Sequence, residues 1–272
     1  MSVKTQELLD SPRPQDHFVQ LYTDDNALAQ NVGRYLSEGF NEGDAGIVIA
    51  TPEHREAFRS NLHSRKVHVD SLEQTRQLLF LDAARTLSRF MVNGRPEWSR
   101  FEATIFSAVE SLARDGRRVR AYGEMVGLLW TSGEYSAAIK LEDHWNRILG
   151  SLGAVLYCSY PIDVFGKEFE ATGVHAILCD HTHLLPRDEA EVLESALRRA
   201  IDAVAGSKVA NFDQTAETSW PAKWGAVPSA ERMILWVRQN LPNSAPEILS
   251  RARDEYRHHQ RFVADDPNPA TL

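Results

Sequence analysis

Residues 118–130 have the sequence Arg-Val-Arg-Ala-Tyr-Gly-Glu-Met-Val-Gly-Leu-Leu-Trp, which predicts a strand, a turn at Gly123 and a following helix. Val119 and Ala121 indicate that the strand enters a buried sheet. Glu124 comes after the end of this strand, and ligands of open α/β sheets bind at the carboxyl ends of the strands. Glu124 therefore marks the expected functional crevice, although a carboxylate here is equally suited to cap the next helix.

Predicted strands alternate with predicted helices along most of the chain. A strand rich in aromatic and β-branched residues is expected at 17–22, and a continuously apolar strand, covered on both faces, at 46–50. Further strands are expected at 77–81 and 154–160, and apolar residues at helical spacing lie between the strands. Such alternation implies βαβ crossovers. The expected fold class is therefore α/β, a three-layer, mostly parallel sheet with helices on both faces.

Composition divides the chain into four expected segments. Residues 1–15 are polar, contain two prolines and are expected to be a mobile leader. Residues 16–205 are expected to form the α/β domain. Residues 206–227 are rich in small and polar residues and are expected to be a linker. Residues 228–272 are expected to form a C-terminal helical segment.

Charge and cysteine content argue against several classes of protein. The net charge of −8, from 38 acidic and 30 basic residues, disfavours nonspecific nucleic-acid binding, because neutralising phosphates requires an excess of Lys and Arg. Only two cysteines are present, Cys158 and Cys179, which disfavours a disulfide framework and fits a reducing compartment. No apolar run approaches the roughly 18 residues of a membrane span. We therefore expect a cytoplasmic protein without nucleic-acid or membrane partners.

The loop after the predicted strand at 46–50 lacks the features of a phosphate-binding loop. Its sequence, Thr51-Pro52-Glu53-His54, has no glycine and no Lys, and it carries an acidic residue. The dinucleotide-binding, nucleophile-elbow and zinc-protease signatures are also missing from the sequence. An enzyme would therefore depend on an unfamiliar arrangement of residues.

Histidines near the end of the expected α/β domain raise the question of a metal site. His175, Cys179 and His183 would share one helix face at four-residue spacing, with His181 beside them, and sulfur and imidazole donors suit zinc or copper. A lone cysteine is more often a small buried apolar residue. We therefore expect a structural role for these residues, and no metal or other cofactor.

A series of motifs resembles the MEDS family of sensory domains. The motifs are His17-Phe-Val-Gln-Leu-Tyr22, Gly-Ile-Val-Ile-Ala-Thr-Pro-Glu-His-Arg at 46–55, Tyr-Gly-Glu-Met-Val-Gly-Leu-Leu-Trp at 122–130, Leu-Glu-Asp-His-Trp-Asn at 141–146 and Tyr-Cys-Ser-Tyr-Pro at 157–161. The resemblance covers about residues 15–186 and implies a RecA-like domain without a P-loop. It also implies a sensory or signalling role through a small ligand or a partner protein. The pocket residues that it implies are His17, Tyr22, Tyr122, Gly123, Glu124, Trp130, Glu142, Trp145, Asn146, Tyr157 and His181.

The leading hypothesis is a non-catalytic sensor. A ligand would enter the crevice near Tyr122 and Glu124, where aromatic side chains suit a small-ligand pocket and Glu142 would be able to face the same space. The C-terminal helices would pass the change to a partner protein or to a second copy in a homodimer. In such a dimer, the helices would bury Trp224, Ile234 and Trp236 between the chains.

Two alternatives remain open. The first alternative is an enzyme that hydrolyses a nucleotide with an unusual phosphate loop, in which Glu124 or Asp82 holds Mg²⁺. The second is an adaptor that works through exposed helices without any ligand. A tightly filled crevice at the strand ends would favour the adaptor.

Overall fold

The computed structural model describes residues 3–187, 190–206 and 227–265. The chain divides into two compact units, which we describe separately. The sheet unit contains Val3–Ile162 and Ala176–Leu185, and the C-terminal unit contains Asp163–His175 and the described part of Pro186–Leu272. This division differs from the expected boundary at residue 205, because the helix at 190–205 contacts the two helices that follow it. The expected linker, 206–227, lies outside the described residues except at its two ends.

The sheet unit is built on six parallel strands in the order β3-β2-β6-β7-β1-β8. Their bounds are β1 His17–Leu21, β2 Ala45–Ala50, β3 Leu78–Asp82, β6 Val119–Gly123, β7 Val155–Tyr160 and β8 His183–Leu184. All residues of β1, β2, β6 and β7 are buried, as expected for strands between two helical layers, and β2 is continuously apolar. The α/β prediction is confirmed. The two-residue strand β8 is too short to leave a period in the sequence.

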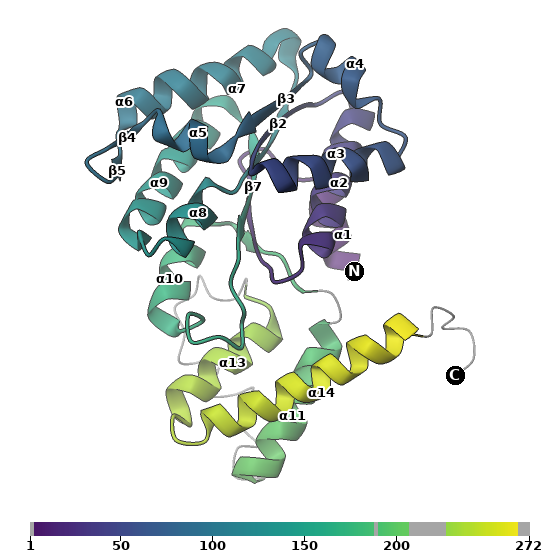
Figure 1. Cartoon of the computed structure of the whole chain (residues 1–272), viewed down its shortest axis with the longest axis vertical. Helices are drawn as coiled ribbons and strands as arrows, with labels where there is room; N and C mark the ends of the chain where they lie inside the picture. The colour runs from purple at the N-terminus through teal and green to yellow at the C-terminus, as the bar shows by residue number, and fades with distance from the viewer. Residues whose placement is uncertain (1–2, 188–189, 207–226, 266–272) are drawn as a thin grey trace. The chain divides into compact units, whose positions relative to one another are not determined.

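Helices cover both faces of this sheet (Figure 1). On one side lie α1 (Val3–Asp10), α2 (Asp25–Asn41) and α3 (Pro52–Ser64), and on the other lie α7 (Ser107–Leu112), α8 (Met125–Thr131) and α9 (Tyr135–Leu152). The remaining elements are α4 Val69–Gln74, α5 Ala83–Ser88, the hairpin of β4 Met91–Val92 and β5 Arg95–Pro96, α6 Trp98–Phe101, a π-helix Glu102–Phe106, a 3₁₀ turn Arg114–Gly116 and α10 Ala171–Asp180. Helix α10 begins in the C-terminal unit and ends in the sheet unit.

The segment expected to be a mobile leader contains a helix, α1, which contacts α2. Leu9 of this helix is fully buried and belongs to the same hydrophobic cluster as Phe18 and Tyr35. Arg34 of α2 donates two hydrogen bonds of 2.6 Å to the Asp10 carboxylate. Leu8 also packs against this cluster. The mostly polar composition of residues 1–15 gave no sign that this helix packs on the core.

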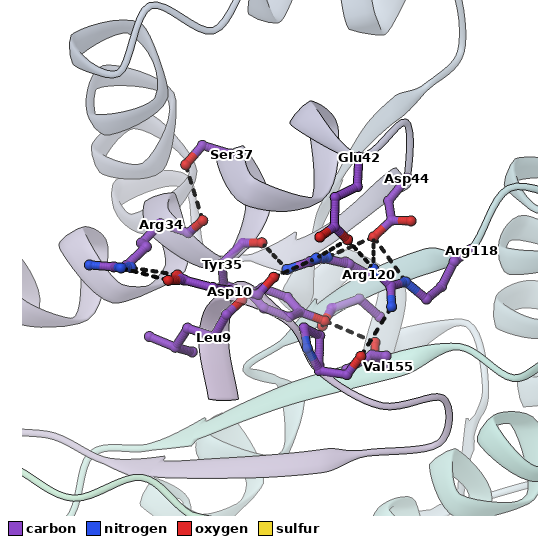
Figure 2. A network of polar contacts seen from close by, with 12 residues as sticks. Leu9, Asp10, Arg34, Tyr35, Ser37, Glu42, Asp44, Arg118, Arg120 and Val155 are labelled. Atoms are coloured by element: carbon purple, nitrogen blue, oxygen red, sulfur yellow. Dashed lines mark hydrogen bonds and ion pairs between the residues drawn. The ribbon is translucent and has the colours of Figure 1, made fainter. Parts of the chain in front are cut away.

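A buried arginine of β6 connects α1 to the sheet (Figure 2). Arg120 is 1% exposed, and its Nε donates to Asp44 at 2.8 Å. Its Nη1 donates to the carbonyls of Leu9 and Tyr35, both at 2.9 Å, and its Nη2 donates to the carbonyl of Asp10 at 3.0 Å. A buried guanidinium is tolerated only when its donors are satisfied, so α1 is part of the folded core.

Three further helices lie in the described part of the C-terminal unit. Their bounds are α11 Ala190–Ala205, α13 Ser229–Asn240 and α14 Ala245–Asp265, and α11 contacts both others. Ile234 is fully buried and Trp236 is 7% exposed within the single chain, so neither side chain requires a second copy to cover it. Trp224, the third residue expected at a dimer interface, lies outside the described residues. Across the described part of the chain, every helix is too short or too polar to span a bilayer.

Candidate functional site

Strand β7 supplies polar side chains to both faces of the sheet, because successive side chains of a strand point to opposite sides. Tyr157 and Ser159 contact residues on the face covered by α2 and α3. Cys158 and Tyr160 contact Glu142 of α9 on the other face. The motif Tyr-Cys-Ser-Tyr therefore contributes to two separate polar groups, which we call the strand-end network and the buried cluster.

Glu124 is the centre of the strand-end network, which also contains Thr51, His54, Tyr122 and Ser159. Its carboxylate accepts a hydrogen bond from the backbone N–H of Thr51 and lies 2.5 Å from Nδ1 of His54. The Tyr122 hydroxyl lies 3.3 Å from the same carboxylate and 2.7 Å from the Ser159 hydroxyl. Glu124 follows β6, whereas Thr51 and His54 follow β2. Since β2 and β6 are neighbouring parallel strands, the network joins their carboxyl ends.

A second group of polar side chains continues the network toward β1. The Tyr157 hydroxyl donates a hydrogen bond to Gln20 Oε1, and Asn31 Nδ2 donates to the same oxygen at 3.4 Å. Tyr157 is fully buried, and Gln20 and Asn31 are 8% and 3% exposed. Gln20 Oε1 is thus the shared acceptor of two buried donors, and among the described residues Asn31 Oδ1 has no partner.

The outer edge of the strand-end network can titrate. The imidazole of His54 is 12% exposed and also lies 3.4 Å from the exposed carboxylate of Asp25. Hydrogen bonding to Glu124 raises the pKa of His54 above its usual 6.5, and Asp25 adds to the effect. Burial, together with the nearby charge of Glu124, raises the pKa of Tyr22, whose ring packs edge-on against the His54 ring. A positive imidazole between two carboxylates is therefore the favoured state of this edge.

Side chains occupy the N-termini of α2 and α3, two of the helices that begin at this edge of the sheet, whereas α8 has no side-chain cap. Asp24 caps α2 by accepting from the N–H groups of Asn26 and Ala27, at 2.8 and 3.2 Å. At the start of α3, Glu124 accepts from Thr51 and the next residue is Pro52, which has no N–H. Since phosphate binding at a helix N-terminus requires free N–H groups, these carboxylates occupy the positions that a phosphate would need.

The buried cluster lies on the α9 face of the sheet and contains His17, Glu142, Cys158 and His181. One side-chain donor atom from each residue lies within 4.8 Å of the others. His17 Nε2 lies 3.3 Å from Cys158 Sγ and 3.4 Å from Glu142 Oε2. The Sγ lies 3.6 Å from the same Glu142 oxygen, and His181 Nε2 lies 3.3 Å from Glu142 Oε1. The four side chains thus converge on one point inside the sheet unit.

Burial and neighbouring charges shift the pKa values of this cluster. Burial and the adjacent His181 lower the pKa of His17. Burial alone would raise the pKa of Glu142, but the two histidines outweigh it and the net direction is downward. Burial and the adjacent Glu142 raise the pKa of the Cys158 thiol and of the Tyr160 hydroxyl. Glu142 is therefore an ionised carboxylate, held among a neutral thiol, a neutral phenol and imidazole rings.

The residues implied by the resemblance divide between the two groups. Tyr122 and Glu124 belong to the strand-end network, with Tyr22 and Tyr157 packed beside it. His17, Glu142 and His181 belong to the buried cluster, with Asn146 hydrogen bonded beside it. Glu124 and Glu142 do not form the shared pair considered from the sequence, because each is bonded to its own set of partners.

The other three implied residues, Gly123, Trp130 and Trp145, make packing contacts. Trp145 is 1% exposed and packs edge-on against Phe101, and a Cβ placed at Gly123 would lie 3.8 Å from the Trp145 ring. Trp130 packs edge-on against Tyr160, whose hydroxyl donates to Glu142 at 2.7 Å. These residues support the walls of the buried cluster and the end of β6.

Six residues that contact these groups were not among those that the resemblance implied: Gln20, Thr51, His54, Cys158, Ser159 and Tyr160. All six lie within the quoted motifs. For the three in β7, the two-residue period of a strand was the available signal. Gln20, Thr51 and His54 have partners distant in the sequence, which no local period connects.

The metal set considered from the sequence is not the set that the fold brings together. His175 is exposed, and His183 lies in β8, where its Nδ1 is 2.8 Å from the Thr182 hydroxyl. The side chain of Cys179 lies outside the described residues. Among the described side chains of the considered group, only His181 belongs to the observed cluster, because α10 ends at Asp180 and the helical spacing does not continue to His183.

The C-terminal unit has a hollow of about 440 Å³ lined in part by Phe165, Arg238, Leu249 and Arg253. Arg238 donates to the carbonyls of Phe165 and Gly166, at 3.0 and 2.8 Å, and Arg253 donates to Asp163 at 2.7 Å. These hydrogen bonds fasten the start of the unit, Asp163–His175, to α13 and α14. The two cations therefore already have partners within the unit.

Comparison with known proteins gives one family. The model described as MEDS, MEthanogen/methylotroph, DcmR Sensory domain, matches residues 16–182. This range includes every member of the strand-end network and of the buried cluster. A search of curated proteins found no match.

Proposed function

Because this chain belongs to the MEDS family of sensory domains, we propose that it is a non-catalytic sensor whose strand-end network binds a small ligand. The observation that carries the proposal is the set of partners around Glu124. Two of them, the Thr51 N–H and the Tyr122 hydroxyl, belong to the rigid sheet edge. The third is the His54 imidazole, which reaches solvent and can be displaced by a competing donor.

The charge of this edge limits the chemistry of the ligand. Glu124, Asp25 and Asp24 lie at or beside it, and the two helix N-termini are capped. An anion would meet these like charges, whereas a small cation or an uncharged hydrogen-bond donor would replace the imidazole at Glu124. The proposed ligand is therefore a small cationic or uncharged polar molecule.

The proposed output is the C-terminal unit. The family match ends at residue 182, before α11, α13 and α14. Helix α10 belongs to both units along the chain and is the proposed covalent route of the signal. A ligand shifts such a conformational equilibrium only by the difference between its affinities for the two states. The receiver is a partner protein or a second copy of this chain.

Thermal-shift measurements on the purified full-length chain test the proposal. The probes are methylammonium and guanidinium as cations, ethanol as an uncharged donor, and inorganic phosphate and Mg-ATP as anions. We expect a cation or the alcohol to raise the melting temperature of the wild type and of the control Glu53→Gln, which removes an exposed acid from the first turn of α3. Glu124→Gln should abolish this increase. An equal increase in Glu124→Gln, or an increase with the anions alone, would contradict the proposal.

A ligand-free adaptor is the second candidate, and the packing at the strand ends favours it. Tyr122, Tyr157 and Ser159 are fully buried and hydrogen bonded among themselves and with neighbouring side chains. If no probe changes the melting temperature and native mass spectrometry of the purified protein detects no retained small molecule, the adaptor is the better description.

The nucleotide-hydrolysing enzyme has less support from the geometry. Asp82 caps α5 by accepting from the Arg85 N–H at 2.8 Å, and it also pairs with Arg55 at 3.3 Å. Glu124 pairs with His54. Both carboxylates considered as Mg²⁺ ligands thus already have cationic partners. Stabilisation by Mg-ATP in the same assay would restore this alternative.

A further inference from the structure

We propose that His17, Glu142, Cys158 and His181 form a binding site for one divalent transition-metal ion of the zinc type. These side chains come from the start of β1, from α9, from the middle of β7 and from the residue after α10. The inference concerns the α9 face of the sheet and does not depend on ligand binding at Glu124.

The spacing of the donor atoms fits a tetrahedral ion. Zinc binds sulfur at about 2.3 Å and imidazole nitrogen or carboxylate oxygen at about 2.0–2.2 Å, so neighbouring donors in a tetrahedral site lie roughly 3.3–3.7 Å apart. Cys158 Sγ and Glu142 Oε2 lie 3.6 Å apart, and they lie 3.3 and 3.4 Å from His17 Nε2. His181 Nε2 lies 3.3 Å from the other carboxylate oxygen of Glu142, Oε1. Each of these distances falls in the tetrahedral range. All four donor atoms lie within 4.8 Å of one another. The widest pair therefore has to close by about 1 Å to reach the tetrahedral range.

The outer hydrogen bonds of the two imidazoles direct their lone pairs into the cluster. Asn146 uses its Nδ2 to donate to the carbonyl of Asp180, so its Oδ1 is the acceptor that faces His17 Nδ1 at 2.9 Å. His181 Nδ1 lies 2.6 Å from the carbonyl of Ile177, which can only accept. In its neutral form, which is the form that binds a metal, each ring therefore carries its proton on Nδ1 and has an acceptor lone pair on Nε2. Partners of this kind orient metal-bound histidines and fix their tautomer.

The convergence of these acceptors calls for a cation. His181 Nε2 has no hydrogen-bond partner among the described residues, although a carboxylate oxygen of Glu142 lies 3.3 Å away. Two nitrogen lone pairs and an ionised carboxylate meet at a point where the side chains of His17, Glu142 and His181 are each 1% exposed. Water does not screen their repulsion there. The Tyr160 hydroxyl, at 2.7 Å, satisfies only one of the carboxylate oxygens.

Charge balance also favours a divalent ion. Binding breaks the S–H bond of Cys158, the sulfur electron pair forms the bond to the metal, and the proton leaves to solvent. The thiolate and the Glu142 carboxylate then carry two negative charges, which a divalent cation neutralises. A neutral site is the form that a protein interior accommodates at least cost. Four protein donors and full burial describe a closed structural site.

Cobalt binding tests the proposal, because Co²⁺ replaces Zn²⁺ and reports its donors spectroscopically. The full-length chain, stripped with a chelator, is titrated with Co²⁺ and then with Zn²⁺. We expect about one equivalent to bind, with a thiolate-to-cobalt charge-transfer band, the intense visible bands of a tetrahedral ion, and loss of both when Zn²⁺ is added. A folded wild type that shows no thiolate band, or only the weak bands of an octahedral ion, would overturn the proposal whatever the variants show.

Variants separate ligands from their supports. Cys158→Ser should remove the charge-transfer band and lower the affinity by on the order of 100-fold or more. The control His183→Gln, two residues beyond His181, should leave the spectrum and the affinity unchanged. Asn146→Ala should weaken binding by about 10–100-fold, and Asn146→Asp, which keeps an oxygen acceptor for His17 Nδ1, should restore part of the loss. Equal spectra in wild type and Cys158→Ser, with both shown to be folded by circular dichroism, would refute the assignment of the sulfur ligand.

Discussion

Replacing Arg120 by Met should destabilise the sheet unit strongly and release α1. The Arg120 guanidinium is 1% exposed and donates to Asp44, to Glu42 and to backbone carbonyls of Leu9, Asp10 and Tyr35. Methionine fills part of the volume but cannot donate, so buried carbonyl groups lose their partner. An unsatisfied buried acceptor costs roughly 1–3 kcal/mol, and removing one member of a buried ion pair costs roughly 3–5 kcal/mol.

Arg118 is a matched control for this substitution. It lies two residues away on the chain and donates to the same carboxylates, to Asp44 at 2.7 Å and to Glu42 at 2.6 Å. Its side chain is 25% exposed, so water replaces much of what Arg118→Met removes. The expected cost for this control is about 0–1 kcal/mol. Arg118 donates to one backbone carbonyl, that of Pro12 at 3.0 Å, whereas Arg120 donates to three. Because Asp44 keeps one arginine partner in each variant, the difference between them reports the burial of Arg120 together with its backbone acceptors.

Urea unfolding followed by circular dichroism measures both variants, and hydrogen exchange reports α1 directly. We expect the midpoint for Arg120→Met to fall well below that for Arg118→Met, and the amides of α1 to lose protection in Arg120→Met alone. If the two variants unfold at the same urea concentration, or if α1 stays protected in Arg120→Met, then the buried guanidinium does not hold α1 to the sheet.

Other perturbations test separate parts of the chain. Burial raises the pKa of Glu231 to about 7, so the native state holds its proton longer than the unfolded chain and stability falls as pH rises from about 4.5 to about 7. The loss in the free energy of unfolding is about 3 kcal/mol, and Glu231→Gln should remove it. If the urea midpoint changes equally between pH 5 and pH 8 in the wild type and in Glu231→Gln, this assignment is refuted. The pKa of His54 is raised by its hydrogen bond to Glu124, so this contact stabilises the fold fully below the unfolded pKa of 6.5 and is lost as pH rises through the higher folded value. An NMR titration of the His54 ring should show the raised pKa in the wild type and its return toward 6.5 in Glu124→Gln, and a titration that is the same in both would contradict the pairing. A Cβ at Gly127 would lie 2.8 Å from a backbone carbonyl of β7, so Gly127→Ala should cost about 1–3 kcal/mol, whereas Gly150→Ala meets nothing within 4 Å and should stabilise its helix by about 0.5–1 kcal/mol. Equal melting temperatures for the two glycine variants would show that the close approach at Gly127 relaxes freely.

The alternation of strands and helices could be predicted because its signals are local. The apolar run at 46–50 and the strand–turn–helix pattern at 118–130 lie within one element or two, and the structure places β2 and β6 there. Glu124 could be identified for the same reason, since the end of a strand is visible in the sequence. The docking of α1 could not be predicted, because it depends on Arg120, more than a hundred residues later in the chain.

The composition of the two polar groups was decided by tertiary structure. His17 is 141 positions from Cys158 and 129 positions from Asn146, and Glu124 is 70 positions from His54. No local period connects residues at such distances. The resemblance therefore implied a single pocket, whereas the fold divides these residues between the strand-end network and the buried cluster. The alternation along β7 was present in the sequence and specified that Tyr157 and Cys158 face opposite sides of the sheet. Which helix covers each side, and therefore which carboxylate and which histidine meet there, follows from the strand order and the crossovers, which only the folded chain defines.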